Sequence, residues 1–210
     1  MSRSLWILVL LVVAGCSTVP ERLPSMPAEE AWSTRQARIR QLDHWMVSGR
    51  IAVRDGNESW HANILWEQTP ERYAISVIAP LGGGTFQLEG DRRRVVLRTP
   101  EDGVYVAGDP DSLMAEVLGL QIPVSGMRYW ILGIPHPGAA TEYDLDPWGR
   151  LKMLRQSKWV VDFLRYRESG EHELPDKVFM RNDRFEVRLV VSEWSMETRS
   201  SAVLIRKSHE

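Results

Sequence analysis

The chain has 210 residues, of which 43% are hydrophobic and 26% are charged, a composition that excludes a disordered or low-complexity protein. Its single cysteine excludes an internal disulfide framework and a metal site built from several cysteines. The formal net charge of −2 lacks the strongly basic balance that is typical of nucleic-acid binding, so we expect no nucleic-acid partner.

The first sixteen residues have the pattern of a targeting segment. Arg3 supplies a positive charge, and an unbroken apolar run follows at residues 5–13. This run has the length of a signal-peptide core and is too short to cross a bilayer, which needs about 20 residues. Small residues then lead to Cys16, the only cysteine of the chain. The alternative is an ordinary secretory signal in which Cys16 is incidental.

Residues 13–16, Val-Ala-Gly-Cys, resemble the lipobox of bacterial lipoproteins. The resemblance implies that residues 1–15 are removed as a signal peptide and that Cys16 carries an N-acyl diacylglycerol. Several acyl chains together hold a protein stably on a membrane, whereas one chain alone binds marginally. Because residue 17 is serine and not aspartate, the resemblance to enterobacterial lipoproteins implies export to the outer membrane.

Residues 16–27 contain three prolines and no apolar period, so we interpret them as the acylated N-terminus and a tether. Residues 28–44 contain neither glycine nor proline, and Trp32, Ile39 and Leu42 share one face. This spacing predicts an amphipathic helix that packs on a sheet. We expect one domain over residues 28–210, with no clear function for residues 195–210.

Alternating apolar residues then predict six short strands linked by turns, within residues 47–54, 60–67, 72–79, 86–89, 94–98 and 104–106. Short links favour an antiparallel meander. Two helices follow: the first is capped by Asp109 and stopped by Gly119, and the second begins with Ser125 as its cap and runs to Leu132.

Strand patterns resume in the second half, within residues 142–145, 151–155, 159–166, 177–181 and 185–191. Trp194 and residues 203–205 are candidates for one more strand. About eleven strands and few helices predict a mainly β protein whose sheet is curved or closed into a barrel. A curved sheet encloses a space, which a helix or a ligand fills.

Residues 80–84, Pro-Leu-Gly-Gly-Gly, lie between two predicted strands. A phosphate-binding loop would require a following lysine and a helix, so we interpret this segment as a hairpin loop. Leu81 is a large apolar residue among glycines. It either folds back into the core or forms an exposed apolar tip for a membrane or a partner.

Motifs of enzymes are lacking in the sequence. No two of the five histidines have a metal-ligand spacing, and no Gly-x-Ser-x-Gly elbow is present. We therefore expect no catalytic residues, no metal and no cofactor besides the lipid on Cys16. A hydrolase would require His61 or His136 to meet a carboxylate in a cleft. The basic run at 92–94 is either a solvated turn or a contact for anionic headgroups or an acidic partner.

One segment of the chain has a specific resemblance. Residues 128–135, Arg-Tyr-Trp-Ile-Leu-Gly-Ile-Pro, resemble the R-x-W-I-L-G-x-P signature of the LolB family of outer-membrane lipoprotein-localisation factors. Residues 140–146 and Arg150-Leu151 are similar to the family's A-T-x-Y-x-L-D…R-L segment, and residues 80–82 match its P-L-G loop. The resemblance covers nearly all of the chain after the lipobox.

The resemblance implies an incomplete antiparallel β-barrel with a helical lid over an apolar cavity. It further implies a monomer, anchored by lipid to the outer membrane and facing the periplasm. This protein would accept lipoproteins from the soluble carrier LolA and insert them into the inner leaflet. The alternative is a structural or assembly lipoprotein that binds partners through its sheet.

The resemblance assigns membrane insertion to Leu81. We expect the acyl cavity to be lined by apolar strand residues and by two residues of the signature segment: Trp60, Ile64, Trp66, Ile75, Val77, Phe86, Leu88, Trp130 and Leu132.

Overall fold

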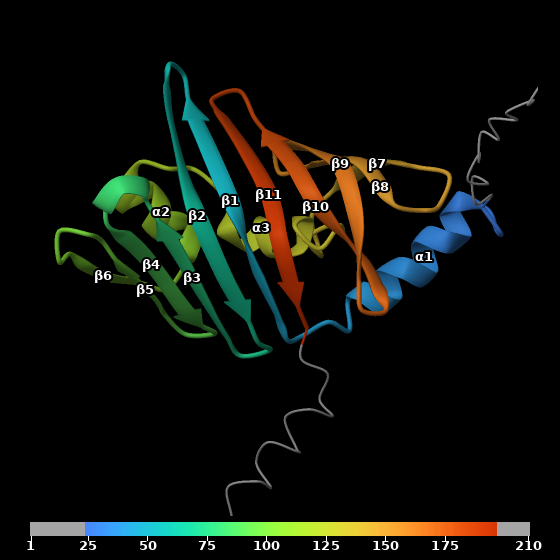
Figure 1. Cartoon of the computed structure of the whole chain (residues 1–210), viewed down its shortest axis with the longest axis horizontal. Coiled ribbons are helices and arrows are strands. Elements are labelled where there is room, and N and C mark those ends of the chain that lie inside the picture. Colours follow the sequence, from blue (N-terminus) through green and yellow to red (C-terminus); the bar gives the residue numbers. More distant parts are fainter. Residues whose placement is uncertain (1–23, 197–210) are drawn as a thin grey trace, which may run out of the picture.

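The computed structural model describes residues 24–196. All of its strands form one antiparallel sheet of eleven strands, in the order β6-β5-β4-β3-β2-β1-β11-β10-β9-β8-β7 (Figure 1). The outermost strands, β6 and β7, pair with only one neighbour each, so the sheet is open. The prediction of an incomplete antiparallel barrel of about eleven strands is confirmed.

The strands have the following bounds: β1 Trp45–Asp55, β2 Glu58–Gln68, β3 Arg72–Ile78, β4 Thr85–Asp91, β5 Val95–Arg98, β6 Val104–Ala107, β7 Thr141–Leu145, β8 Leu151–Gln156, β9 Trp159–Ser169, β10 His172–Arg181 and β11 Phe185–Ser195. β1 to β6 pair in chain order, as do β7 to β11, because short links join antiparallel neighbours. The two halves meet where β1 pairs with β11.

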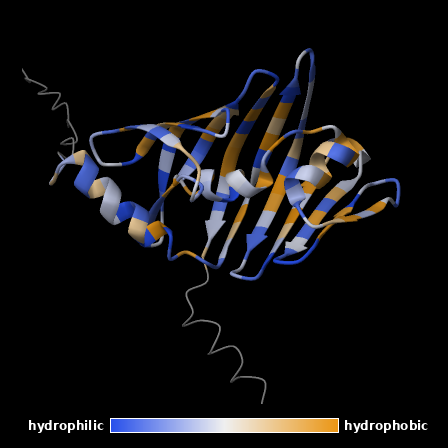
Figure 2. Ribbon diagram, turned by 180° about the vertical axis from the view of Figure 1, so that it is seen from behind, coloured by the Kyte–Doolittle hydropathy of each residue, from blue (hydrophilic) through white to orange (hydrophobic). Residues whose placement is uncertain are grey.

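Two helices connect the halves of the sheet. They are α2 (Pro110–Leu118) and α3 (Val124–Trp130), between β6 and β7 in the chain. Seen from behind, they lie in front of the sheet, over strands that alternate between apolar and polar residues (Figure 2). We call the sheet face that they cover the inner face. A third helix, α1 (Ala28–Ile39), lies at the end of the sheet near β7 (Figure 1).

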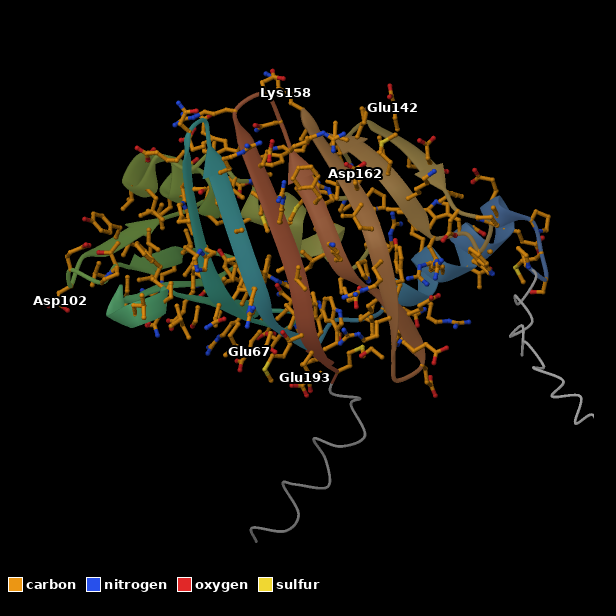
Figure 3. All side chains as sticks on the ribbon, turned by 45° about the horizontal axis from the view of Figure 1, so that its top comes forward. Glu67, Asp102, Glu142, Lys158, Asp162 and Glu193 are labelled. Atoms are coloured by element: carbon orange, nitrogen blue, oxygen red, sulfur yellow. The ribbon has the colours of Figure 1, made fainter. Side chains whose placement is uncertain are left out.

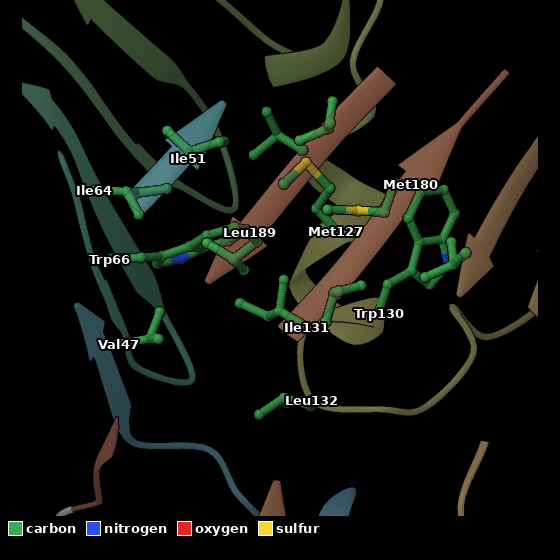
Figure 4. Close-up of a cluster of buried hydrophobic side chains, with 14 of the residues drawn as sticks. Val47, Ile51, Ile64, Trp66, Met127, Trp130, Ile131, Leu132, Met180 and Leu189 are labelled. Atoms are coloured by element: carbon green, nitrogen blue, oxygen red, sulfur yellow. The ribbon is translucent and has the colours of Figure 1, made fainter. Parts of the chain in front are cut away.

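The inner face carries the core. A continuous row crosses five strands, with Val47, Trp66, Ile75, Leu88 and Leu97 paired in turn, and each of these side chains is at most 7% exposed. The signature segment packs on the same core. Its Trp130, Ile131 and Leu132 lie among strand residues of β1, β2, β10 and β11 (Figure 4).

The outer face is polar and carries ion pairs between strands. Arg181 pairs with Asp162 of β9, which Figure 3 labels, and Arg184 donates to Asp55 at 2.6 Å. Exposed pairs of this kind contribute at most about 1 kcal/mol each. The contrast between the two faces therefore fixes the register, because a slip by one residue would turn the apolar rows outward.

Some expected boundaries are wrong. The first helix ends at Ile39 and not at 44, because β1 begins at Trp45 and the chain turns between them: the Leu42 N–H bonds to the Ile39 carbonyl, three residues back, at 3.0 Å. Ser125 does not cap α3: Pro123 takes that position, and Ser125 bonds instead to the carboxylate of Asp111 in α2.

Asp109 caps α2 and Gly119 ends it in a left-handed conformation, as expected. Trp194 belongs to β11 and forms no separate strand. Residues 1–23, with the signal segment and Cys16, lie outside the described residues, as does the strand candidate at 203–205.

Gly49 of β1 lies at a register shift against β11, where the two backbones approach closely. A Cβ at this position would lie 2.3 Å from the Val190 carbonyl oxygen. We expect Gly49→Ala to lower the free energy of unfolding by about 1–3 kcal/mol, the usual cost of overpacking. Urea unfolding of Gly49→Ala beside Gly108→Ala, whose Cβ would meet nothing within 4 Å, measures this. Equal stability of the two variants would refute the steric argument.

Candidate functional site

The loop between β3 and β4 is closed by its own backbone. The Ala79 N–H bonds to the Gly84 carbonyl at 3.0 Å, and the Gly83 N–H bonds to the Pro80 carbonyl at 3.1 Å, forming the short 3-10 turn η1 (Pro80–Gly82). Gly82 and Gly84 have φ of 79° and 87°, a conformation that glycine adopts without steric cost. These bonds hold the backbone of the tip in one shape.

Leu81 lies at the tip of this loop with its side chain entirely in solvent. Its relative exposure is 105%, and its φ and ψ are 56° and 33°. A left-handed conformation is unfavourable by about 1–2 kcal/mol for a residue with a side chain. Of the two alternatives, the structure therefore shows the exposed tip and not the folded-back leucine. Strained and exposed apolar residues gather at functional sites.

The strand candidates for the cavity all lie on the inner face. Pairing places Ile64 beside Val77, and Val77 beside Phe86, in a second row next to that of Trp66. Burial divides the nine candidates. The buried ones are Ile64, Trp66, Ile75, Leu88, Trp130 and Leu132; Val77 and Phe86 are half-buried; and Trp60 is 39% exposed.

A pocket of about 220 Å³ lies between the helices and the inner face at Trp66, the one cavity candidate that lines it. Its lining is mixed: Trp66, Gln68, Tyr73, Pro110, Val124, Ser125, Arg128, Tyr129 and His136. Burial, together with the nearby Asp111 and Asp109, raises the pKa of Tyr73 to about 12, so this lining residue is neutral at physiological pH. Pockets for small ligands measure about 300–1,000 Å³. The pocket under the helices is thus smaller than a usual ligand pocket.

The signature segment is held by a buried residue that sequence reasoning missed. Gln156 of β8 is 3% exposed. Its Oε1 accepts from the Trp130 indole at 2.8 Å and from the His136 N–H at 2.9 Å. Its Nε2 donates to the His136 carbonyl at 2.9 Å and to the Thr141 hydroxyl at 2.7 Å. Gln156 is a polar residue at an inward-facing position of β8, where an apolar residue is expected. This departure from the alternation is the feature of the sequence that could have revealed it.

The second matching segment forms a turn that supports α1. The Arg150 Nε donates to the Asp146 carboxylate at 2.6 Å, and its guanidinium also pairs with Glu173. The guanidinium lies 5.0 Å from the centre of the Tyr166 ring, over which Arg35 of α1 lies at 5.1 Å. These residues join the helix to the sheet.

Other candidates lie apart from the Leu81 loop. Arg93 and Arg94 follow Asp91, whose carboxylate accepts from both of their N–H groups, at the opposite end of β4 from the loop. Within residues 24–196, no hydrogen bond or ion pair joins His61 or His136 to a carboxylate.

Two further features are absent from residues 24–196. No cluster of three or more His, Cys, Asp or Glu residues suited to a metal ion is found there. None of the helices in the same range is long and apolar enough to cross a membrane.

The site thus combines an open sheet with an apolar inner face, two covering helices and an exposed leucine tip. A sequence model of the family described as "Outer membrane lipoprotein LolB" matches residues 43–194. The chain belongs to the LolB family. The resemblance inferred from the sequence is thus confirmed.

Individual LolB proteins match along nearly their whole length. The outer-membrane lipoprotein LolB of Nitrosococcus oceani is 34% identical over 194 residues, which cover 92% of this chain and 96% of the relative. That of Ectopseudomonas mendocina is 33% identical over 188 residues, covering 89% and 92%. A solved LolA superfamily protein from Nitrosomonas europaea has a TM-score of 0.56 at 8% identity, covering 85% of this chain and 97% of that one, which shows a shared fold.

Membership of the LolB family makes the chain an outer-membrane lipoprotein with a receptor role in lipoprotein localisation. The alternative of a structural or assembly lipoprotein is not favoured. Pro80–Gly82 form the turn that carries Leu81, and the two remaining segments that resemble the family hold helices on the inner face and at the end of the sheet.

Proposed function

We propose that this protein accepts lipoproteins from the periplasmic carrier LolA and inserts them into the inner leaflet of the outer membrane. The observation that carries the proposal is Leu81, fully exposed at the tip of a loop that leaves the apolar inner face of the sheet. Membership of the LolB family supports the same role.

The cargo of such a receptor carries acyl chains that are costly to expose to water. Each CH₂ group transferred from water contributes about 0.8 kcal/mol, so hiding part of two chains gives high affinity. The inner face offers this apolar surface once α2 and α3 move away from it, since the pocket of about 220 Å³ is too small otherwise. The two helices act as the lid.

Delivery needs no nucleotide in this scheme. Each acceptor binds the acyl chains better than the one before, and the bilayer finally solvates all of them. One leucine contributes only about 1.5–3 kcal/mol when it is buried. Leu81 therefore orients the receptor and opens a path at the membrane without trapping the receptor there.

The anchor and the tether belong to the proposal as well. Residues 1–15 are a signal peptide, and Cys16 carries an N-acyl diacylglycerol that holds the protein on the outer membrane, facing the periplasm. Residues 16–27 link this lipid to a single lipid-binding domain, and the protein acts as a monomer. Cargo binding resides in the domain and does not need the anchor.

Depletion of the protein from its own bacterium tests this proposal. We expect outer-membrane lipoproteins to accumulate in the periplasm as complexes with LolA, because their acceptor is missing. Fractionation of the periplasm and of both membranes measures this redistribution, and re-expression of the full chain should reverse it. Normal localisation of lipoproteins in depleted cells would contradict the proposal.

A further inference from the structure

The inner face becomes exposed toward one end of β2. The inner-facing side chains of this strand are Trp66, Ile64, Ala62 and Trp60. Their exposed fractions are 2%, 5%, 5% and 39%, respectively. The buried core thus ends at Trp60, whose indole reaches solvent although its cross-strand partner Val53 is 1% exposed.

The inner-facing side chains of the neighbouring strands also become more exposed toward this end. Ile75 of β3 and Leu88 of β4 lie in the row of Trp66 and are buried. Val77 and Phe86 lie one row farther along and are half-buried. Three adjacent strands therefore open the apolar face toward the same end.

That end carries the Leu81 loop. The pairing of β2 with β3 stops at Asn63 and Ile78, and Ile78 is itself 44% exposed. The turn η1 follows directly in the chain and contacts β2. Trp60, three residues before Asn63 on β2, thus lies on the part of β2 that extends past β3, toward the leucine tip.

The opposite end of these strands is polar. Gln68 is buried there, and its Nε2 donates to the carbonyls of Thr69 at 2.6 Å and Arg72 at 3.2 Å. The buried Gln68 and the mixed pocket that it lines make this end less favourable for an acyl chain than the end at Trp60.

We propose that Trp60 forms the exit rim of the inner face and contacts the acyl chain of the cargo as it passes from the core toward Leu81 and the bilayer. This inference rests on the proposed function and adds the direction in which the acyl chain leaves the inner face. It also separates Trp60 from the other cavity candidates: Trp60 acts during delivery, whereas the buried residues act during uptake.

Tryptophan suits such a rim. Its large apolar ring covers an acyl chain, while its indole N–H stays hydrated, and this combination places tryptophan at boundaries between apolar and wet surroundings. A rim residue of this kind shields the chain from water over the last part of the sheet. Removing the ring leaves a gap between the buried core and the leucine tip.

The first test separates uptake from delivery. Trp60→Ser should accept a labelled lipoprotein from LolA as the unchanged protein does. Its delivery to phospholipid vesicles should be about tenfold slower, the effect of losing one aromatic contact from an apolar path. Trp60→Phe should deliver normally. Trp148→Ser is the matched control, because Trp148 has the same exposed fraction of 39% and lies just after β7, beside α1.

Delivery by Trp60→Ser at the normal rate would overturn the proposal. Equal losses of uptake and delivery would overturn it too, because Trp60 would then be part of the cavity wall. Unfolding curves of both serine variants show whether the fold is kept, and quenching in the phenylalanine variants tests the acyl contact if Trp60→Ser is unstable.

The second test needs no carrier. Dibromostearic acid quenches the fluorescence of tryptophans that its acyl chain touches. We expect quenching to fall in Trp60→Phe and to remain unchanged in Trp148→Phe. Equal quenching of Trp60→Phe and the unchanged protein would overturn the acyl contact, whereas a failure of cargo transfer by the unchanged protein would refute the proposed function instead.

Discussion

Leu81→Glu will accept lipoproteins from the carrier and will fail to insert them into membranes. Leu81 is fully exposed, so glutamate at this position leaves the core intact. Loss of one buried leucine removes about 1.5–3 kcal/mol at the membrane, a factor of about ten to one hundred in rate or affinity. A carboxylate adds a large cost on entering an apolar phase. Transfer to vesicles, measured after loading in solution, gives the effect.

Two controls belong to this experiment. Leu81→Met keeps an apolar side chain at the tip and should retain delivery. Val104→Glu adds the same charge to another exposed apolar position, on the edge strand β6 where Val104 is 61% exposed, and should leave delivery nearly unchanged. Delivery by Leu81→Glu at the normal rate would remove the role assigned to the loop.

Gln156→Leu will have the largest effect on stability. Leucine has a similar size but satisfies neither the Trp130 indole N–H nor the N–H and carbonyl of His136. Each buried polar group left without a partner costs about 1–3 kcal/mol. We expect the free energy of unfolding to fall by about 3 kcal/mol or more, and urea unfolding measures it.

The matched variant is Gln87→Leu, at a half-buried position on the outward-facing row of β4. It should change the free energy of unfolding by less than about 1 kcal/mol, the usual effect of substitutions away from buried networks. If both variants were equally stable, the signature segment would not depend on Gln156. The hydrogen bond from the Trp130 indole to Gln156 would then not be what holds Trp130 over the inner face.

Alternation of apolar residues predicted most of the sheet because every second side chain of a strand points to the same face, and the face that is buried requires apolar residues. Val47, Ile51 and Val53 alternate in the sequence and all three face the core. The same residues could not show where a strand or helix ends. The end of α1 at Ile39 depends on where β1 has to begin, and the start of α3 depends on Asp111 in a different helix.

The sequence predicted some residues of the site and missed others. Sequence could place Leu81 in a loop but could not decide between core and solvent, since that outcome depends on a left-handed backbone held by bonds at residues 79–84. Alternation placed Trp60 on the correct face but gave no sign that it lies at the exposed end of that face. Gln156 was missed because its partners lie 15–26 residues away in the chain.

Transfer of a radiolabelled lipoprotein from LolA to this protein in solution tests whether the protein accepts cargo from the carrier. A version that starts after Cys16 is used, so that acceptance is measured without the anchor. We expect the label to leave the carrier and to co-elute with this protein, without any nucleotide. Label that stays on the carrier at every concentration of the folded protein would show that this protein is not the acceptor.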